Sequence, residues 1–231
     1  MRLTFASYNI HKAVGRDRRY DPERVLTVLR ELGADVVALQ EADRRYGRRE
    51  SVLPRQMLDE HHWQVVPIAM RPASIGWHGN AILVRRGLDI IDGDRMTLPM
   101  LEPRGSVRAG LACAGRRFEV VGMHLDLSGM VRRRQVATVC SAITRMGAPA
   151  VLMGDLNEWS PTRGALAAFG SPWNVLMPGK SFPSGRPLAA LDRIVHSSQW
   201  QCDRTWVHHS AAAALASDHL PVLAKLSWMA D

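Results

Sequence analysis

The chain has few cysteines and few aromatic residues. Cys113, Cys140 and Cys202 are odd in number, far apart and outside any spacing that binds a metal. The sequence therefore predicts reduced thiols, as in a soluble cytoplasmic protein. Phe, Trp and Tyr make up 6% of the residues, but a 46% hydrophobic share still suffices for a substantial core.

Long apolar runs are also lacking. None approaches the roughly 20 residues that a transmembrane helix needs, and residues 1–10 are typical of a strand rather than a secretory signal. The chain has no Gly-rich phosphate loop, no Gly-x-Ser-x-Gly elbow and no paired-cysteine motif. The chemistries that depend on those motifs have no support here.

Acidic residues are in deficit. Against 22 Asp and Glu stand 30 Lys and Arg, for a formal charge of +8. Arginine forms bidentate contacts with phosphate, so this excess favours an anionic partner such as nucleic acid or anionic lipid head groups. Solvated arginines without a partner are the alternative. The excess is concentrated in three clusters: Arg16, Arg18 and Arg19; Arg44, Arg45, Arg48 and Arg49; and Arg132 to Arg134.

Strand-like segments dominate the hydrophobic pattern. Helices are predicted at 22–33, between an Asp21 N-cap and Gly33, at 55–62, and at 130–146. Strands are predicted at 3–10, 35–39, 63–68, 79–84, 88–91, 106–113, 118–125, 149–153, 191–195 and 221–226. Because strands often follow one another without a helix between them, we expect one α+β domain over residues 1–231, with much antiparallel pairing.

Polar side chains stand where several of these strands end. Glu41 follows a buried-type strand, where a carboxylate is costly unless it is paired or bound to a cation such as Mg²⁺. Asp155 and Asn157 are two residues apart, so in extended backbone both face one substrate or water. Taken singly, a solvated loop glutamate and an Asp-x-Asn turn are the competing interpretations.

Histidines accompany carboxylates at two more strand ends. His124 precedes Asp126 by two residues, and His219 follows Asp218 directly. Histidine is suited to proton transfer near neutral pH, and Asp192 could orient the His219 imidazole. A histidine satisfied at a strand end, a turn cap, or an Asp192 paired with arginine are the alternatives.

Read in order, these segments resemble the endonuclease/exonuclease/phosphatase superfamily, which includes pancreatic-type deoxyribonuclease, exonuclease III-like enzymes and neutral sphingomyelinases. The resemblance runs from residue 8 to 221, and Ser181-Phe182-Pro183-Ser184 ahead of Leu191-Asp192-Arg193-Ile194 is similar to small bacterial members. It is carried by Tyr8-Asn9-Ile10-His11, Leu39-Gln40-Glu41, Gly79-Asn80-Ala81-Ile82, His124-Leu125, Gly154-Asp155-Leu156-Asn157, Leu191-Asp192-Arg193-Ile194 and Ser217-Asp218-His219.

The resemblance implies a four-layer α/β/β/α sandwich of two mostly antiparallel sheets, and catalysis with Mg²⁺ or Mn²⁺ at one rim. The implied roles are the metal for Glu41, Asn9 and Asp218, and water activation, phosphate contact or proton transfer for His124, Asp155, Asn157, Asp192 and His219. Apart from the resemblance, substrate binding is expected for Asn80 and for Arg132 of the third arginine cluster.

The expected activity is hydrolysis of a phosphodiester or phosphomonoester in nucleic acid, a phospholipid or a small molecule. Ala189-Ala190 precede Leu191-Asp192 where apurinic-site enzymes usually carry a Trp-Arg pair, which counts against that repair role. A basic nucleic-acid-binding module on a catalytically retired scaffold is the alternative function. A monomer is favoured.

Overall fold

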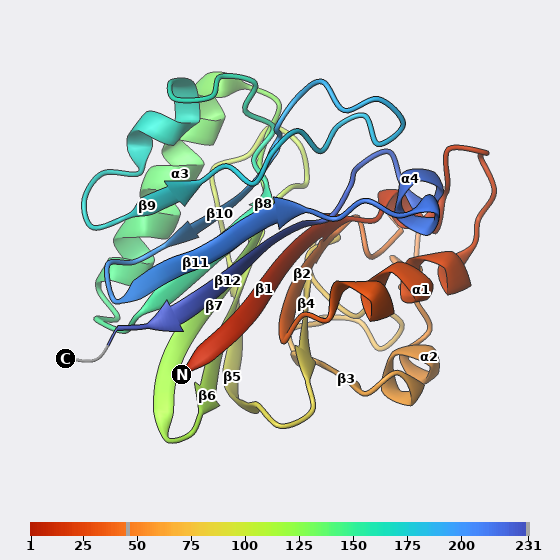
Figure 1. Cartoon of the computed structure of the whole chain (residues 1–231), viewed down its shortest axis with the longest axis horizontal. Helices are drawn as coiled ribbons and strands as arrows, with labels where there is room; N and C mark the ends of the chain where they lie inside the picture. Colours follow the sequence, from red (N-terminus) through yellow and green to blue (C-terminus); the bar gives the residue numbers. More distant parts are fainter. Residues whose placement is uncertain (45–46, 230–231) are drawn as a thin grey trace.

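Two six-stranded sheets lie face to face, with helices on their outer faces, in a computed structural model that describes residues 1–44 and 47–229. Helices α1, α2 and α4 lie beside one sheet, and α3 lies at the other (Figure 1). The predicted α+β class and four-layer α/β/β/α sandwich are confirmed. Arg45, from the second arginine cluster, lies outside the described residues.

The elements, in chain order, are β1 (Arg2–Asn9), the 3-10 turn η1 (His11–Ala13), α1 (Pro22–Leu32), β2 (Val36–Gln40), α2 (Arg55–Glu60), β3 (Trp63–Val65), β4 (Ala81–Arg85), β5 (Asp89–Met96), β6 (Ser106–Cys113), β7 (Arg116–His124), α3 (Gly129–Thr144), β8 (Ala150–Asp155), η2 (Gly164–Ala168), β9 (Asn174–Leu176), β10 (Asp192–His196), β11 (Trp200–Val207), α4 (Ala211–Ala216) and β12 (Val222–Trp228).

Both sheets are mostly antiparallel. The first has the order β11-β12-β1-β2-β4-β3 and the second β5-β6-β7-β8-β10-β9. The pairs β1–β2 and β7–β8 are parallel, and the crossovers that join them contain α1 and α3. In each parallel pair the two carboxyl ends lie at the same edge, which brings their loops together.

Three apolar layers hold the sandwich together. Between the sheets, the rings of Phe5, Phe118 and Trp200 meet edge to face with centroids 5.5 to 6.1 Å apart. A second layer packs α1 on the first sheet, and a third packs α3 on the second. The inter-sheet layer fixes how the two sheets stand relative to each other, and with them the two halves of the rim.

Sequence patterning missed β9, β11 and α4. Strand β11 lies at a sheet edge, and only Trp200 among its residues is fully buried, so it lacks a strong alternation. Helix α4 is one short alanine-rich turn between two serines. In α3, Val131 is only half-buried, whereas Arg132 and Gln135 are buried. The polar rim loops require those buried polar groups.

Within residues 1–44 and 47–229, none of the helices combines the length and the hydropathy that a membrane crossing requires. The longest of them, α3, has 16 residues and contains three consecutive arginines.

Candidate active site

His124, Asp155 and Asp192 form a row across the rim of the second sheet. His124 is the register partner of Asp155 in the parallel pair β7–β8, and Asp192 is its partner in the antiparallel pair β10–β8. Each residue stands at an end of its strand. All three are at least nine-tenths buried, with exposures of 6%, 2% and 0% respectively.

The first sheet brings two more predicted residues to the same rim. Asn9 ends β1 and is the register partner of Gln40, the last residue of β2, so Glu41 follows at the same edge. The Asn9 amide Nδ2 donates to Asp155 Oδ2 at 3.1 Å. This bond connects the two sheets directly, and the predicted residues from both therefore share one site.

Asp155 Oδ2 is the centre of this arrangement. Besides the Asn9 amide, it has His124 Nε2 at 3.5 Å and His219 Nε2 at 3.7 Å. A carboxylate between two imidazoles is a geometry suited to accepting a proton from water while the imidazoles contact a bound anion.

His219 is held from its other side. Its Nδ1 lies 2.9 Å from Asp192 Oδ2, and the Ser181 hydroxyl donates to the same oxygen. The His219 amide donates to the Ser217 hydroxyl, which itself donates to the Asn9 carbonyl at 2.7 Å. The Asp218–His219 segment is thereby attached to the end of β1, and the imidazole is fixed with Nε2 toward Asp155.

The two histidines have opposite charge preferences. Burial disfavours the charged form of both. For His219, the charges of Asp192 and Asp155 outweigh burial and raise its pKa to about 10. For His124, burial dominates, Asp155 opposes it, and the charges of Arg104 and His219 add to it, which lowers its pKa to about 3. Near neutral pH the site thus holds one imidazolium and one neutral imidazole.

Asn157 turns its side chain back to the rim through a left-handed backbone with φ of 50°. Its amide N–H donates to Asp155 Oδ1 at 2.9 Å, and its side-chain Nδ2 donates to the Leu125 carbonyl at 3.0 Å. An Asn side chain has a second N–H. This second N–H is available for the predicted phosphate contact.

Asn80 is fully buried, and its Nδ2 donates to the Gly105 carbonyl at 3.1 Å. Its Oδ1 has no hydrogen-bond partner among the described residues. A buried unpaired acceptor is costly. This oxygen could therefore accept a bond from a ligand.

Arg132 does not face a substrate surface. Its guanidinium is buried and donates to the Asp126 and Leu127 carbonyls and to Glu158 Oε2 at 3.3 Å. Asp126 in turn accepts backbone N–H groups, including that of Leu101 at 3.0 Å. We therefore replace the predicted substrate role of Arg132 with a structural one: it organises the loop between β7 and α3.

Glu41 is paired with a cation. It adopts φ of 56°, and its Oε2 contacts Lys12 Nζ. Lys12 is the middle residue of three consecutive left-handed residues, His11 to Ala13, directly after β1. The Glu41 carboxylate thus already binds a positive charge, the Lys12 ammonium. The Asn9 amide and the half-buried Asp218 carboxylate lie on adjoining rim segments. Together these three groups are a donor set that fits a hard divalent cation.

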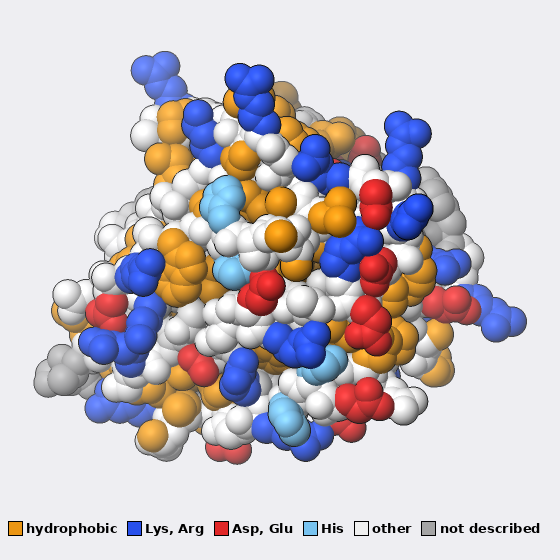
Figure 2. All heavy atoms as spheres, turned by 45° about the vertical axis from the view of Figure 1, so that its right-hand side comes forward, with side chains coloured by type: hydrophobic (Ala, Val, Ile, Leu, Met, Phe, Trp, Pro, Cys, Tyr) orange, Lys and Arg blue, Asp and Glu red, His pale blue; other side chains and the backbone are white. Residues whose placement is uncertain are grey.

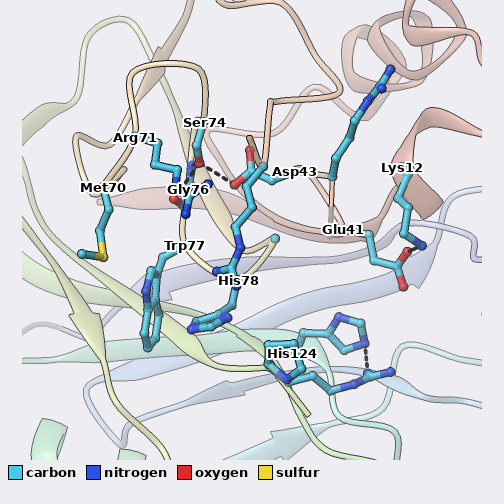
Figure 3. A pocket seen from close by; sticks show the side chains of 15 residues that line it. Lys12, Glu41, Asp43, Met70, Arg71, Ser74, Gly76, Trp77, His78 and His124 are labelled. Carbon is cyan, nitrogen blue, oxygen red and sulfur yellow. Dashed lines mark hydrogen bonds and ion pairs between the residues drawn. The ribbon is translucent and has the colours of Figure 1, made fainter. Parts of the chain in front are cut away.

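Beside the row lies a cavity of about 300 Å³ that sequence reasoning did not predict. Figure 3 shows Lys12 directed at Glu41, with His124 on one side and Trp77 and His78 on another. The lining comprises Lys12, Glu41, Asp43, Arg44, Arg49, Met70, Arg71, Ser74, Gly76, Trp77, His78, Gly79, Pro103, Arg104 and His124. The second arginine cluster was the available signal, but its spacing does not reveal a cavity.

Arg104 is a further residue that the sequence did not single out. Its guanidinium contacts His124 Nε2 and donates to the Leu125 carbonyl at 3.2 Å, while its Nε pairs with Glu102. Arg104 therefore adds a positive charge directly against the neutral imidazole. On the space-filling surface, blue Lys and Arg side chains surround scattered red carboxylates and pale-blue histidines on this side of the molecule (Figure 2).

Comparisons with known proteins agree with this architecture. The family model described as "Endonuclease/Exonuclease/phosphatase family" matches residues 6–219. No curated protein matches the chain by sequence. Among solved structures, a Bacteroides vulgatus endonuclease/exonuclease/phosphatase aligns with a TM-score of 0.77 at 16% identity, over 99% of both chains.

Two further structures carry functional descriptions. D. rerio TDP2 complexed with single-strand DNA product has a TM-score of 0.76 at 15% identity, with 98% of this chain and 99% of that chain covered. The mannosyl-6-phosphatase Bt3783 of Bacteroides thetaiotaomicron has a TM-score of 0.72 at 20% identity, over 98% and 100%. At these identities the likeness shows the shared fold.

Proposed function

Because this chain belongs to the endonuclease/exonuclease/phosphatase family, we propose that it is a divalent-metal-dependent hydrolase of phosphoester bonds. One observation carries the proposal: Asp155 Oδ2 lies within 3.7 Å of the Asn9 amide, His124 Nε2 and His219 Nε2. Three groups from three separate stretches of chain thus meet at a single carboxylate oxygen of a fourth.

In the proposed reaction, Asp155 accepts a proton from the attacking water. The water oxygen forms the new bond to phosphorus while the bond from phosphorus to the leaving oxygen breaks. His219, kept as an imidazolium by Asp192, donates a hydrogen bond from Nε2 to a phosphoryl oxygen and stabilises the charge that develops there. The free N–H of Asn157 contacts a second phosphoryl oxygen. His124, neutral, orients the bound phosphate.

Glu41 is the proposed principal ligand of Mg²⁺ or Mn²⁺, with Asn9 and Asp218 beside it. When bound, such an ion polarises a phosphoryl oxygen and neutralises its charge. Asp155, Asp192 and His219 also lie within 4.8 Å of one another and could offer ligand atoms. We prefer Glu41, because the protonated His219 has no free lone pair and already binds Asp192.

The substrate we propose is a phosphoester of nucleic acid, a phospholipid or a small molecule, acted on by a monomer whose residues 1–231 form one domain. The three cysteines are free thiols, which suits the proposed cytoplasmic location. The TDP2 complex with DNA product and the mannosyl-6-phosphatase support the wider class, since one binds a polymer and the other is described as a phosphatase of a small sugar ester.

The test is hydrolysis of bis-p-nitrophenyl phosphate by the full chain with Mg²⁺ or Mn²⁺. Asp155→Asn removes the proton acceptor and keeps the side-chain shape, so we expect a loss of about 10²–10⁴-fold in kcat. Asp89→Asn, at an exposed position on β5, is the matched control and should retain wild-type turnover. Equal activity of Asp155→Asn and wild type would overturn the assignment of the base.

A basic binding module without catalysis is the second candidate, favoured by the charge of +8 alone. It predicts DNA retention that weakens with salt and no turnover of any phosphoester with either metal. Absence of turnover in the wild type across that panel, with DNA binding retained, would favour this candidate.

A further inference from the structure

We propose that the cavity beside the catalytic row is a second anion subsite, which selects phosphoesters bearing another phosphate group next to the scissile one. This inference rests on the proposed function, because it places the second phosphate on the substrate of that reaction. Its walls include the described residues 43–44 and 47–51, called the hairpin below, and the loop of residues 70–79.

The lining is strongly cationic. Arg44, Arg49 and Arg71 have no ion-pair partner among the described residues. The two carboxylates of the lining do not compensate them. Glu41 is paired with Lys12, and Asp43 is buried, with its oxygens accepting from the Ser74 hydroxyl at 2.6 Å and the Ile75 amide at 3.2 Å.

Hydrogen bonds fix the backbone of both walls, and one of them holds the Arg71 guanidinium. Asp43 and Ser51 form an antiparallel bridge, and the Arg44 amide donates to the Glu50 carbonyl at 2.8 Å, so the hairpin has a defined register. Arg71 donates from its guanidinium to the Gly47 carbonyl at 2.8 Å, which joins the hairpin to the second wall. The Arg71 guanidinium, which this bond orients, therefore loses less entropy when it binds phosphate.

Trp77 and His78 line one end of the cavity, and His78 provides a hydrogen-bond acceptor. Their rings lie 4.2 Å apart, centroid to centroid. His78 bonds the Pro103 backbone through one nitrogen, and its buried Nδ1 has no partner among the described residues. Burial and the nearby Arg49 charge lower the His78 pKa. A neutral imidazole whose other nitrogen carries the proton accepts at Nδ1, which suits a ligand hydroxyl beside the phosphate.

The cavity is continuous with the catalytic row, because His124 belongs to both, and the proposed metal ligand Glu41 also lines the cavity. Gly79 has φ of +80°, and a Cβ there would lie 3.4 Å from the Glu41 Cα, so the second wall approaches the proposed metal ligand closely. A ligand in the cavity therefore adjoins the scissile phosphate. With a volume of about 300 Å³, the cavity admits one phosphorylated group rather than a duplex.

Phosphate binding tests the subsite without turnover. Inorganic phosphate is titrated into Asp155→Asn while tryptophan fluorescence is followed. Phosphate beside Trp77 should change the emission, and Trp77→Phe should abolish that change. Arg44→Gln/Arg49→Gln should weaken phosphate binding about 10- to 100-fold. Arg133→Gln/Arg134→Gln, which removes the same two charges from exposed positions on α3, should not.

Kinetics test the selectivity. The full chain is assayed with thymidine dinucleotides with and without a 5′-phosphate, and with glycerophosphoglycerol with and without a terminal phosphate. We expect at least about tenfold higher kcat/KM for the phosphorylated member of one pair, and the pair that shows it identifies the source of the second phosphate. The Arg44/Arg49 variant should lose the preference and still hydrolyse bis-p-nitrophenyl phosphate.

Two results would overturn the subsite: equal phosphate affinity in the Arg44/Arg49 and Arg133/Arg134 variants, or no preference in either substrate pair while bis-p-nitrophenyl phosphate is cleaved. If the wild type cleaves no phosphoester at all, the proposed function fails. The fluorescence titration still decides in that case whether the cavity binds phosphate.

Discussion

His219 Nδ1 lies 2.9 Å from Asp192 Oδ2, and both residues are almost completely buried. The register of β10 against β8 places Asp192 beside Asp155, so a single carboxylate is at once the partner of the imidazole and the neighbour of the proposed base. The charge state of His219 therefore depends on the pairing of two strands as much as on its own loop.

Replacing Asp192 by Asn should act through His219. The uncharged amide no longer stabilises the imidazolium, so the pKa of His219 should fall from about 10. We expect kcat to fall about 10²–10⁴-fold and the upper limit of the pH–rate profile to move to lower pH. Measuring that profile distinguishes this positioning role from general damage, because a variant that is merely less stable would keep the wild-type limit.

Stability should also report the charge of His219. Its pKa is raised from 6.5 in the unfolded chain to about 10 in the folded protein, so the folded state binds the proton more tightly. This contribution is fully present below pH 6.5 and is lost as pH rises toward 10. Urea unfolding of wild type and His219→Gln across pH 6 to 10 measures it: their difference in unfolding free energy should shrink with rising pH. A constant difference would contradict the raised pKa.

Glu41→Gln should weaken divalent metal binding by at least about tenfold, since an amide replaces the proposed principal carboxylate ligand. Titration of Mn²⁺ followed by electron paramagnetic resonance measures the free ion and needs no turnover. Glu23→Gln, an exposed position in the first turn of α1, is the control and should leave the affinity unchanged. An unaltered Mn²⁺ affinity in Glu41→Gln would mean that the metal does not bind at the end of β2.

Phe118→Ala should destabilise the protein by about 3–5 kcal/mol, because this fully buried ring packs edge to face on Phe5 and Trp200 between the sheets. Phe118→Leu retains most of the volume and should cost less. Urea unfolding monitored by circular dichroism gives both values. A loss below 1 kcal/mol for the alanine variant, about the cost of one buried methylene, would mean that the inter-sheet layer repacks around the cavity.

Much of the fold was predictable because its central strands are apolar and end in turn residues. Helix α1 was predicted with its Asp21 cap and Gly33 terminus, and the structure confirms both. Strand β6 spans Ser106–Cys113 as predicted. The edge strands β9 and β11 were missed, because an edge strand that is largely exposed carries little hydrophobic alternation.

The site was predictable as an ordered set of strand ends, but its contacts were not. Spacing along the chain cannot show that Asn9 donates to Asp155, because 146 residues separate them. Arg132 was selected from a cluster of arginines, but its side chain forms hydrogen bonds within the buried loop that follows β7 and with Glu158. Lys12 and Arg104 acquire their relevance from the left-handed turn at 11–13 and the path of the loop before β6, which residue types alone do not encode.

The hairpin begins two residues beyond Glu41, and none of its described residues, 43–44 and 47–51, contributes a side chain to the row on β7, β8 and β10. The proposed catalytic residues and the arginines of the proposed subsite thus lie in separate stretches of the polypeptide. Transplanting another hairpin between Ala42 and Val52 should exchange what the protein accepts without rebuilding how it cleaves, and natural diversification could follow the same route.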